Sequence, residues 1–185
     1  MNAPRWDQSM NTPAKRITIK LPNGTIVTVM DLPKNHLKKT LLEELLPRMV
    51  EEAVVLSVCD RHGAPVYLNT GAFELFDLPT EHHVLLPDVV AYSHDQQALF
   101  LIEVVHSVGC IDRYRINDLK RFALHAPCNV VFVSVFASRA AYAARMGETI
   151  ADTQVWFVDE PGHSIYVSNS PEKSERIIAA RLAKR

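Results

Sequence analysis

The apolar segment 129–136 is the feature that most narrows the folds open to this chain. It reads NVVFVSVF, so nearly every residue is apolar rather than every second one. A strand with this pattern is typical of the centre of a sheet that is covered on both faces. We therefore expect a β-sheet with helices packed against it.

The other segments predict the elements that surround this strand. Alternating residues on both sides of Asn23-Gly24 predict a β-hairpin over 16–32, and leucines at helical spacing predict a helix over 33–52. Further strands are expected at 53–60, 88–92, 98–105, 153–159 and 163–168, and further helices at 70–78, 112–126, 138–151 and 170–185. This order predicts an α/β fold whose mixed β-sheet is flanked by helices.

The length of 185 residues is that of one domain with its own core. We expect a disordered N-terminal tail over 1–15 and a single domain over 16–185 that ends in a basic helix. The net charge of −1 argues against an indiscriminate binder of polyanions. Basic residues nevertheless outnumber acidic ones by three in both 1–21 and 171–185. These two segments are either solvated charged ends or patches that hold nucleic acid.

Targeting signals are not evident. No apolar run approaches the roughly 20 residues of a membrane helix, and residues 1–16 do not have the apolar core of a signal peptide. Cys59, Cys110 and Cys128 are too widely spaced for a disulfide framework. We expect a cytoplasmic protein with reduced thiols.

Two acidic residues, Asp88 and Glu103, lie in the strands on either side of the polar turn 93–97. If that turn closes an antiparallel hairpin, opposed residue numbers sum to roughly 190 or 191, which sets Asp88 against or beside Glu103. Two buried carboxylates at that distance repel one another unless a cation lies between them. The spacing leaves two alternatives: salt bridges with Arg or Lys, or a site for Mg²⁺, which takes one or two carboxylates and several waters.

A longer series of motifs resembles a known family. Pro87-Asp88, followed after fourteen residues by Glu103-Val104-Val105, is similar to the PD-(D/E)XK nuclease pattern. More narrowly, the segments LPDVVAY, LFLIEVVHSVGCIDRYRINDL and TQVWFVDEPGHSIYVSN resemble the catalytic domain of BsuBI/PstI-type restriction endonucleases, with coverage of about residues 17–169. The resemblance implies a restriction-endonuclease-like core. It does not include the N-terminal region that this family carries ahead of the catalytic domain.

The resemblance also implies roles for particular residues. Asp88 and Glu103 match the acids that bind Mg²⁺, for which Mn²⁺ can substitute. Val105 stands where the general motif has its lysine, so the resemblance implies that a cation comes from the helix that follows. Arg115 would hold the scissile phosphate, and Lys120 lies further along the same helix.

Glu44, on the first helix, resembles a glutamate of the family that would add a third acid. The other interpretation is an exposed glutamate beside neighbouring basic residues. The eight histidines do not follow the ligand spacing of zinc hydrolases, so we expect no zinc site.

These patterns favour a Mg²⁺-dependent endonuclease of restriction type that cleaves double-stranded DNA. We expect it to act as a homodimer or with a partner subunit, and not at a membrane. One alternative is a catalytically weak or inactive nuclease-fold protein that binds nucleic acid or a protein partner, since Tyr114 stands where the family often has lysine. Another is an unrelated α/β interaction domain.

Overall fold

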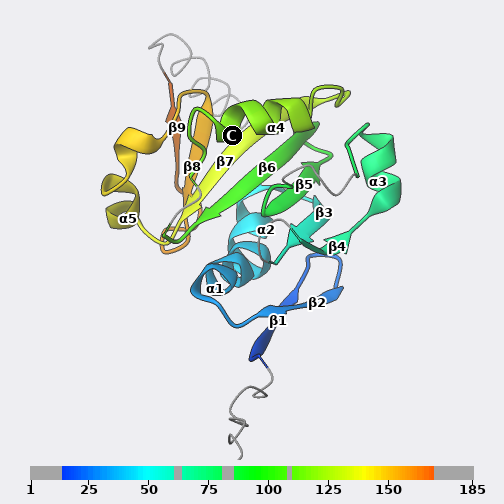
Figure 1. Cartoon of the computed structure of the whole chain (residues 1–185), viewed down its shortest axis with the longest axis horizontal. Helices are drawn as coiled ribbons and strands as arrows, with labels where there is room; N and C mark the ends of the chain where they lie inside the picture. Colours follow the sequence, from blue (N-terminus) through cyan, green and yellow to red (C-terminus); the bar gives the residue numbers. More distant parts are fainter. Residues whose placement is uncertain (1–13, 61–63, 81–85, 108–109, 169–185) are drawn as a thin grey trace, which may run out of the picture.

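The computed structural model describes residues 14–60, 64–80, 86–107 and 110–168. Within them, a seven-stranded sheet forms the centre of the molecule, with the strand order β4-β3-β5-β6-β7-β8-β9 (Figure 1). The strands are β3 (Ala53–Cys59), β4 (Pro65–Leu68), β5 (Val89–Ser93), β6 (Ala98–Val105), β7 (Asn129–Phe136), β8 (Thr153–Phe157) and β9 (Ser164–Val167). The pairs β6–β7 and β7–β8 are parallel, and the other neighbours are antiparallel. The predicted α/β fold with a mixed sheet is confirmed, and β4 is a strand that the sequence did not predict.

A hairpin of β1 (Arg16–Lys20) and β2 (Ile26–Met30) forms a separate two-stranded sheet. Gly24 has a φ of +85° in its turn, a conformation that glycine adopts without steric cost. The Thr25 amide donates to Asn23 Oδ1 at 3.0 Å, and this short-range hydrogen bond stabilises the turn. The hairpin predicted on both sides of Asn23-Gly24 is therefore confirmed.

The first helix runs through three consecutive parts, α1 (Pro33–Thr40), the π-turn η2 (Leu41–Leu45) and α2 (Leu46–Met49). Pro47 has no N–H with which to continue the α-helical ladder. Just before it, the Leu46 amide donates to the carbonyl of Leu41, five residues back, which is the hydrogen bond that defines a π-turn. The leucines at helical spacing in this turn and just after it, Leu41, Leu42, Leu45 and Leu46, are nevertheless all fully buried.

Apolar side chains cover both faces of the central strands. On β7, Val133 and Val135 belong to a cluster with the leucines of the first helix. Val130 and Phe132 pack on the opposite face, against the cluster that contains α4 (Arg115–Phe122). The first cluster also takes in the β1–β2 hairpin, and the second takes in α3 (Thr70–Leu75). The prediction that 129–136 is a strand covered on both sides is thus confirmed.

The later helices are shorter than predicted. α4 (Arg115–Phe122) begins three residues late because Asp112 Oδ1 accepts the amides of Tyr114 and Arg115 and so holds 112–114 in a turn. α5 (Arg139–Ala143) ends early, and a short 3₁₀ turn, η3 (Met146–Glu148), follows it. Figure 1 shows α4 lying across β6 and β7.

Two predictions fall outside the described part of the chain. Nearly all of the predicted tail 1–15 and the predicted basic helix 170–185 lie there. Among the described residues, no helix is long and apolar enough to cross a membrane.

Candidate active site

The antiparallel pairing of β5 with β6 brings the two predicted acids together. Val89 lies opposite Ile102, so the next residues outward in the same register are Asp88 and Glu103. Both acids are buried, with exposed fractions of 7% and 5%. The Val104 amide donates to Asp88 Oδ2 at 2.9 Å, which ties the carboxylate of one strand to the backbone of the other.

Two lysines of α1 approach Asp88. Lys34 Nζ lies 2.7 Å from Asp88 Oδ2, and Lys38 Nζ lies 3.3 Å from Asp88 Oδ1. Because the lysines are four residues apart, they lie on the same face of the helix. Lys38 is fully buried and also donates to the carbonyls of Cys59 and Asp60 at the end of β3.

Arg115 approaches Glu103 from the other helical layer. Its Nε and Nη2 donate to Glu103 Oε1 at 2.8 and 2.6 Å, and Nη2 also donates to the carbonyl of Leu86 at 3.1 Å. Arg115 is the first residue of α4, so the turn that Asp112 holds fixes where its side chain starts. The two acids are thus reached from opposite sides of the sheet, Asp88 by α1 and Glu103 by α4.

The two carboxyl groups have different electrostatic environments. Burial alone would raise the pKa of Asp88, but Lys38, Lys34 and the Val104 amide outweigh it and hold that pKa below its ordinary value. For Glu103, burial and then the negative charge of Asp88 raise the pKa to about 8, against the opposing effect of Arg115. Such a pair of unequal carboxyl groups is typical of functional sites.

The structure does not bring Glu44 or Lys120 to this pair. Glu44 lies within the π-turn and is exposed. Its neighbour Glu43 instead accepts the Lys20 amide and pairs with Lys39. Lys120 is exposed on α4.

At the position where the general motif has its lysine, this chain has Val105, a residue of the hydrophobic core. Val105 is 2% exposed and packs in a cluster with Phe136, Tyr142 and Phe157. The cations at the site therefore come from α1 and α4. Sequence reasoning missed Lys34 and Lys38, although Lys38 precedes Leu42 and Leu45 at helical spacing and so falls in line with the buried leucines.

The donor set suits a hard cation only in part. Mg²⁺ binds in proteins through one or two carboxylates and retains several waters, and Asp88 and Glu103 supply that many. In the described residues, no group of three or more His, Cys, Asp or Glu side chains is arranged to hold a metal ion. The pair therefore fits a cation that keeps most of its water, and a lysine must give way for the cation to reach Asp88.

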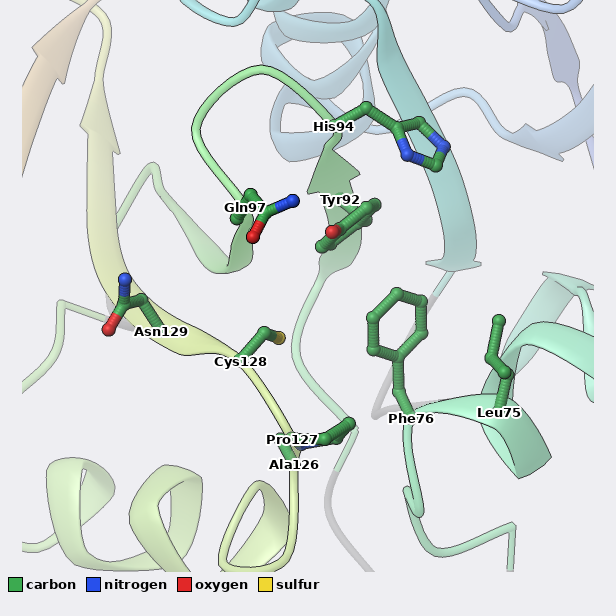
Figure 2. Close-up of a pocket in the computed structure, with 9 residues that line it drawn as sticks. All are labelled: Leu75, Phe76, Tyr92, His94, Gln97, Ala126, Pro127, Cys128 and Asn129. Atoms are coloured by element: carbon green, nitrogen blue, oxygen red, sulfur yellow. The ribbon is translucent and has the colours of Figure 1, made fainter.

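A cavity of about 610 Å³ lies at the opposite end of the strands. Tyr92 of β5 and His94 just after that strand form one side of it, and residues 126–129, which lead into β7, form another (Figure 2). Figure 2 shows the ring of Phe76 turned toward that of Tyr92, and their centroids are 4.6 Å apart. Asp88 precedes β5, so this cavity does not contain the acidic pair.

Among solved structures, the chain resembles that of the SdaI restriction endonuclease, with a TM-score of 0.75 and 29% sequence identity over 84% of this chain and 49% of that one. The mixed sheet and its flanking helices are therefore those of a restriction endonuclease fold. Residues 17–170 match the family model of the BsuBI/PstI restriction endonuclease domain, and the chain belongs to that family. The type II restriction enzyme BsuBI of Bacillus subtilis is 26% identical over 151 residues, which are 82% of this chain and 48% of that enzyme. The chain thus spans about half the length of these two relatives, and the predicted resemblance is confirmed.

Proposed function

We propose that this chain is the catalytic domain of a Mg²⁺-dependent DNA endonuclease of restriction type. The observation that carries the proposal is the pair of buried carboxylates, Asp88 and Glu103, on adjacent antiparallel strands. Burying two carboxyl groups side by side is costly unless cations partner them, and two adjacent carboxylates are the ligands that Mg²⁺ takes in proteins. The relatives named as restriction enzymes support DNA as the substrate.

Each residue has a distinct part in this proposal. Asp88 and Glu103 would hold Mg²⁺, or Mn²⁺ in its place. The bound cation would lower the pKa of a water and stabilise negative charge on a phosphoryl oxygen. Arg115, which donates from Nε and Nη2 to Glu103 Oε1, would orient that acid toward the cation. The contact with the scissile phosphate that the resemblance implies for Arg115 stays a prediction.

The hydrolysis exchanges one bond to phosphorus for another. The oxygen of a water forms a bond to phosphorus and its proton passes to solvent, while the bond from phosphorus to the leaving oxygen breaks and that oxygen takes up a proton from solvent. Lys120, exposed on the same helix as Arg115, would contact a phosphate of the DNA. A role for Glu44 as a third acid stays a prediction.

The family supports DNA as the substrate. We propose double-stranded DNA as the substrate and a homodimer, or a partner subunit, as the active assembly, since cleavage of both strands calls for two sites. The three cysteines are free thiols, which fits action in the cytoplasm.

A second candidate is a nuclease-fold protein that binds nucleic acid or a protein partner without cleaving DNA. The observation that favours it is the charge balance, because three cationic side chains already surround the two carboxylates. A site of that kind would need no metal ion.

Cleavage of supercoiled and linear DNA distinguishes the two candidates. Wild type, Asp88→Asn and Glu103→Gln would be compared with Mg²⁺, with Mn²⁺ and with EDTA. The nuclease predicts metal-dependent cuts by wild type that both variants lose. Folded wild-type protein that leaves both DNAs uncut under every condition would favour the second candidate.

A further inference from the structure

The acidic pair of this chain has no lysine on its own strand. Val105 occupies the position two residues after Glu103 and is buried among aromatic side chains. Three other cationic side chains surround the carboxylates, namely Lys34, Lys38 and Arg115. To contact a substrate, one of these side chains must break its contacts with the protein.

All of the hydrogen-bonding capacity of the Lys38 ammonium is used within the protein. Its ammonium donates to the carbonyls of Cys59 and Asp60 and lies 3.3 Å from Asp88 Oδ1, so three acceptors take up its three N–H groups. The side chain has no exposed surface. Lys38 is therefore a positioning residue, which links Asp88 to the end of β3.

Arg115 is also committed to the protein. Nε and Nη2 both donate to Glu103 Oε1, and Nη2 donates to the Leu86 carbonyl as well. Moving this guanidinium would break several hydrogen bonds at once and leave Glu103 without its cationic partner.

Lys34 differs from the other two cations. Its side chain is 36% exposed, and among the described residues its ammonium contacts a single acceptor, Asp88 Oδ2, at 2.7 Å. It lies in the first turn of α1, where water reaches its flexible four-carbon stem. Breaking its one ion pair leaves no other buried group without a partner, since Lys38 and the Val104 amide still contact Asp88.

Charge balance indicates that Lys34 must move when a divalent cation binds. Three cations already face two carboxyl groups, so even with both groups ionised a divalent ion would add two more positive charges to a site that has an excess of at least one. Of the three, Lys34 is the one that can leave at little cost. Once displaced, its ammonium stays tethered at the solvent side of the site, from which DNA and water would arrive.

We propose that Lys34 of α1 is a catalytic residue of this site, which exchanges its ion pair with Asp88 for the scissile phosphate when a divalent cation binds. This inference rests on the proposed nuclease function. Lys34 would donate a hydrogen bond to a phosphoryl oxygen, in place of a lysine at position 105. No proton transfer by Lys34 is needed.

The test combines cleavage with metal binding for Lys34→Met, and Lys39→Met is the matched control. Lys39 is on the same helix but pairs with Glu43 instead of Asp88. With saturating Mn²⁺, Lys34→Met should lower kcat by about 10²–10³-fold, the usual cost of losing one donor to a developing negative charge. Lys39→Met should cleave DNA as wild type does.

Metal affinity, measured by calorimetric titration of Mn²⁺ without DNA, gives the second readout. Lys34→Met should bind Mn²⁺ at least as tightly as wild type, by up to about fivefold, because the competing ammonium is gone. Asp88→Asn should lose the binding. Lys34→Gln serves as a second variant if Lys34→Met does not fold.

Two results would overturn the inference while the nuclease function stands. One is wild-type kcat in folded Lys34→Met when Asp88→Asn is inactive. The other is an equal loss of Mn²⁺ affinity and cleavage in Lys34→Met and Lys34→Gln, which would make Lys34 structural. If wild type itself neither binds Mn²⁺ nor cuts DNA, the proposed function fails first.

Discussion

Replacement of Lys38 by methionine should destabilise the protein strongly. The methionine keeps most of the length of the side chain but removes the ammonium. Asp88, which is buried, then loses one of its two cationic partners, and the carbonyls of Cys59 and Asp60 lose a donor. The change therefore breaks a buried ion pair without relieving the burial of its other member.

The size of the effect follows from these contacts. Removing one member of a buried ion pair costs about 3–5 kcal/mol. Asp88 keeps two partners in this variant, Lys34 and the Val104 amide, so the lower end of that range is expected. A domain of this size is stabilised by about 5–15 kcal/mol in total, so the loss is a large fraction. Since 1 kcal/mol shifts the melting temperature of such a chain by about 2–4 °C, Lys38→Met should melt roughly 6–12 °C lower.

Urea denaturation in EDTA at neutral pH would measure this free energy of unfolding. Lys39→Met is the control on the next residue, where the ion pair with Glu43 is partly exposed and should contribute about 1 kcal/mol or less. In an Asp88→Asn background the cost of Lys38→Met should shrink, because the buried charge has been removed. If the two methionine variants differed from one another by less than about 1 kcal/mol, the buried position of the Lys38 ammonium would be refuted.

Three further predictions concern the acidic pair. A divalent cation at 100 times its dissociation constant should stabilise wild type by about 2.7 kcal/mol. Scanning fluorimetry should show this as a rise of roughly 5–10 °C in Tm, whereas the Tm of Asp88→Asn should not rise. Because the pKa of Glu103 is raised to about 8 in the folded protein, that protein binds more protons than the unfolded chain between pH 4.5 and 8. The stability contributed by Glu103 is thus complete at low pH and is lost as the pH rises through this window. The urea midpoint of wild type, measured in EDTA, should therefore fall between pH 5 and 9, and that of Glu103→Gln should fall less. Parallel curves for the two proteins would contradict the raised pKa. Arg115→Lys cannot reproduce the two hydrogen bonds to Glu103 Oε1, so its Mn²⁺ affinity in calorimetry should fall by about 10- to 100-fold, and unchanged affinity would show that Arg115 does not orient Glu103.

The pairing of Asp88 with Glu103 could be predicted because it depends on a short turn. Five polar residues between two apolar runs predict both the hairpin and its register to within one residue, and the observed pairing of Val89 with Ile102 falls inside that range. The burial of β7 was predictable for a similar reason, since its composition alone indicates two covered faces.

The lysines at Asp88 could not be located in the same way. Lys34 and Lys38 meet Asp88 only because α1 packs near the ends of β3 and β5, and no local pattern specifies that packing. Glu44 was assigned from the resemblance to the family, and its exposed position in the π-turn could not be derived from that resemblance. The strand β4 was missed because its four residues are only half-buried or exposed and carry no clear alternation.

The central claim is that Asp88 and Glu103 form a metal site from which Lys34 withdraws. A crystal of the protein soaked in Mn²⁺ and measured at an anomalous wavelength tests it most directly. We predict a manganese peak about 2.0–2.2 Å from an oxygen of each carboxylate, with Lys34 moved off Asp88 Oδ2 and Lys38 unmoved. A map in which Lys34 still contacts Asp88 and no manganese lies between the two acids would contradict the claim.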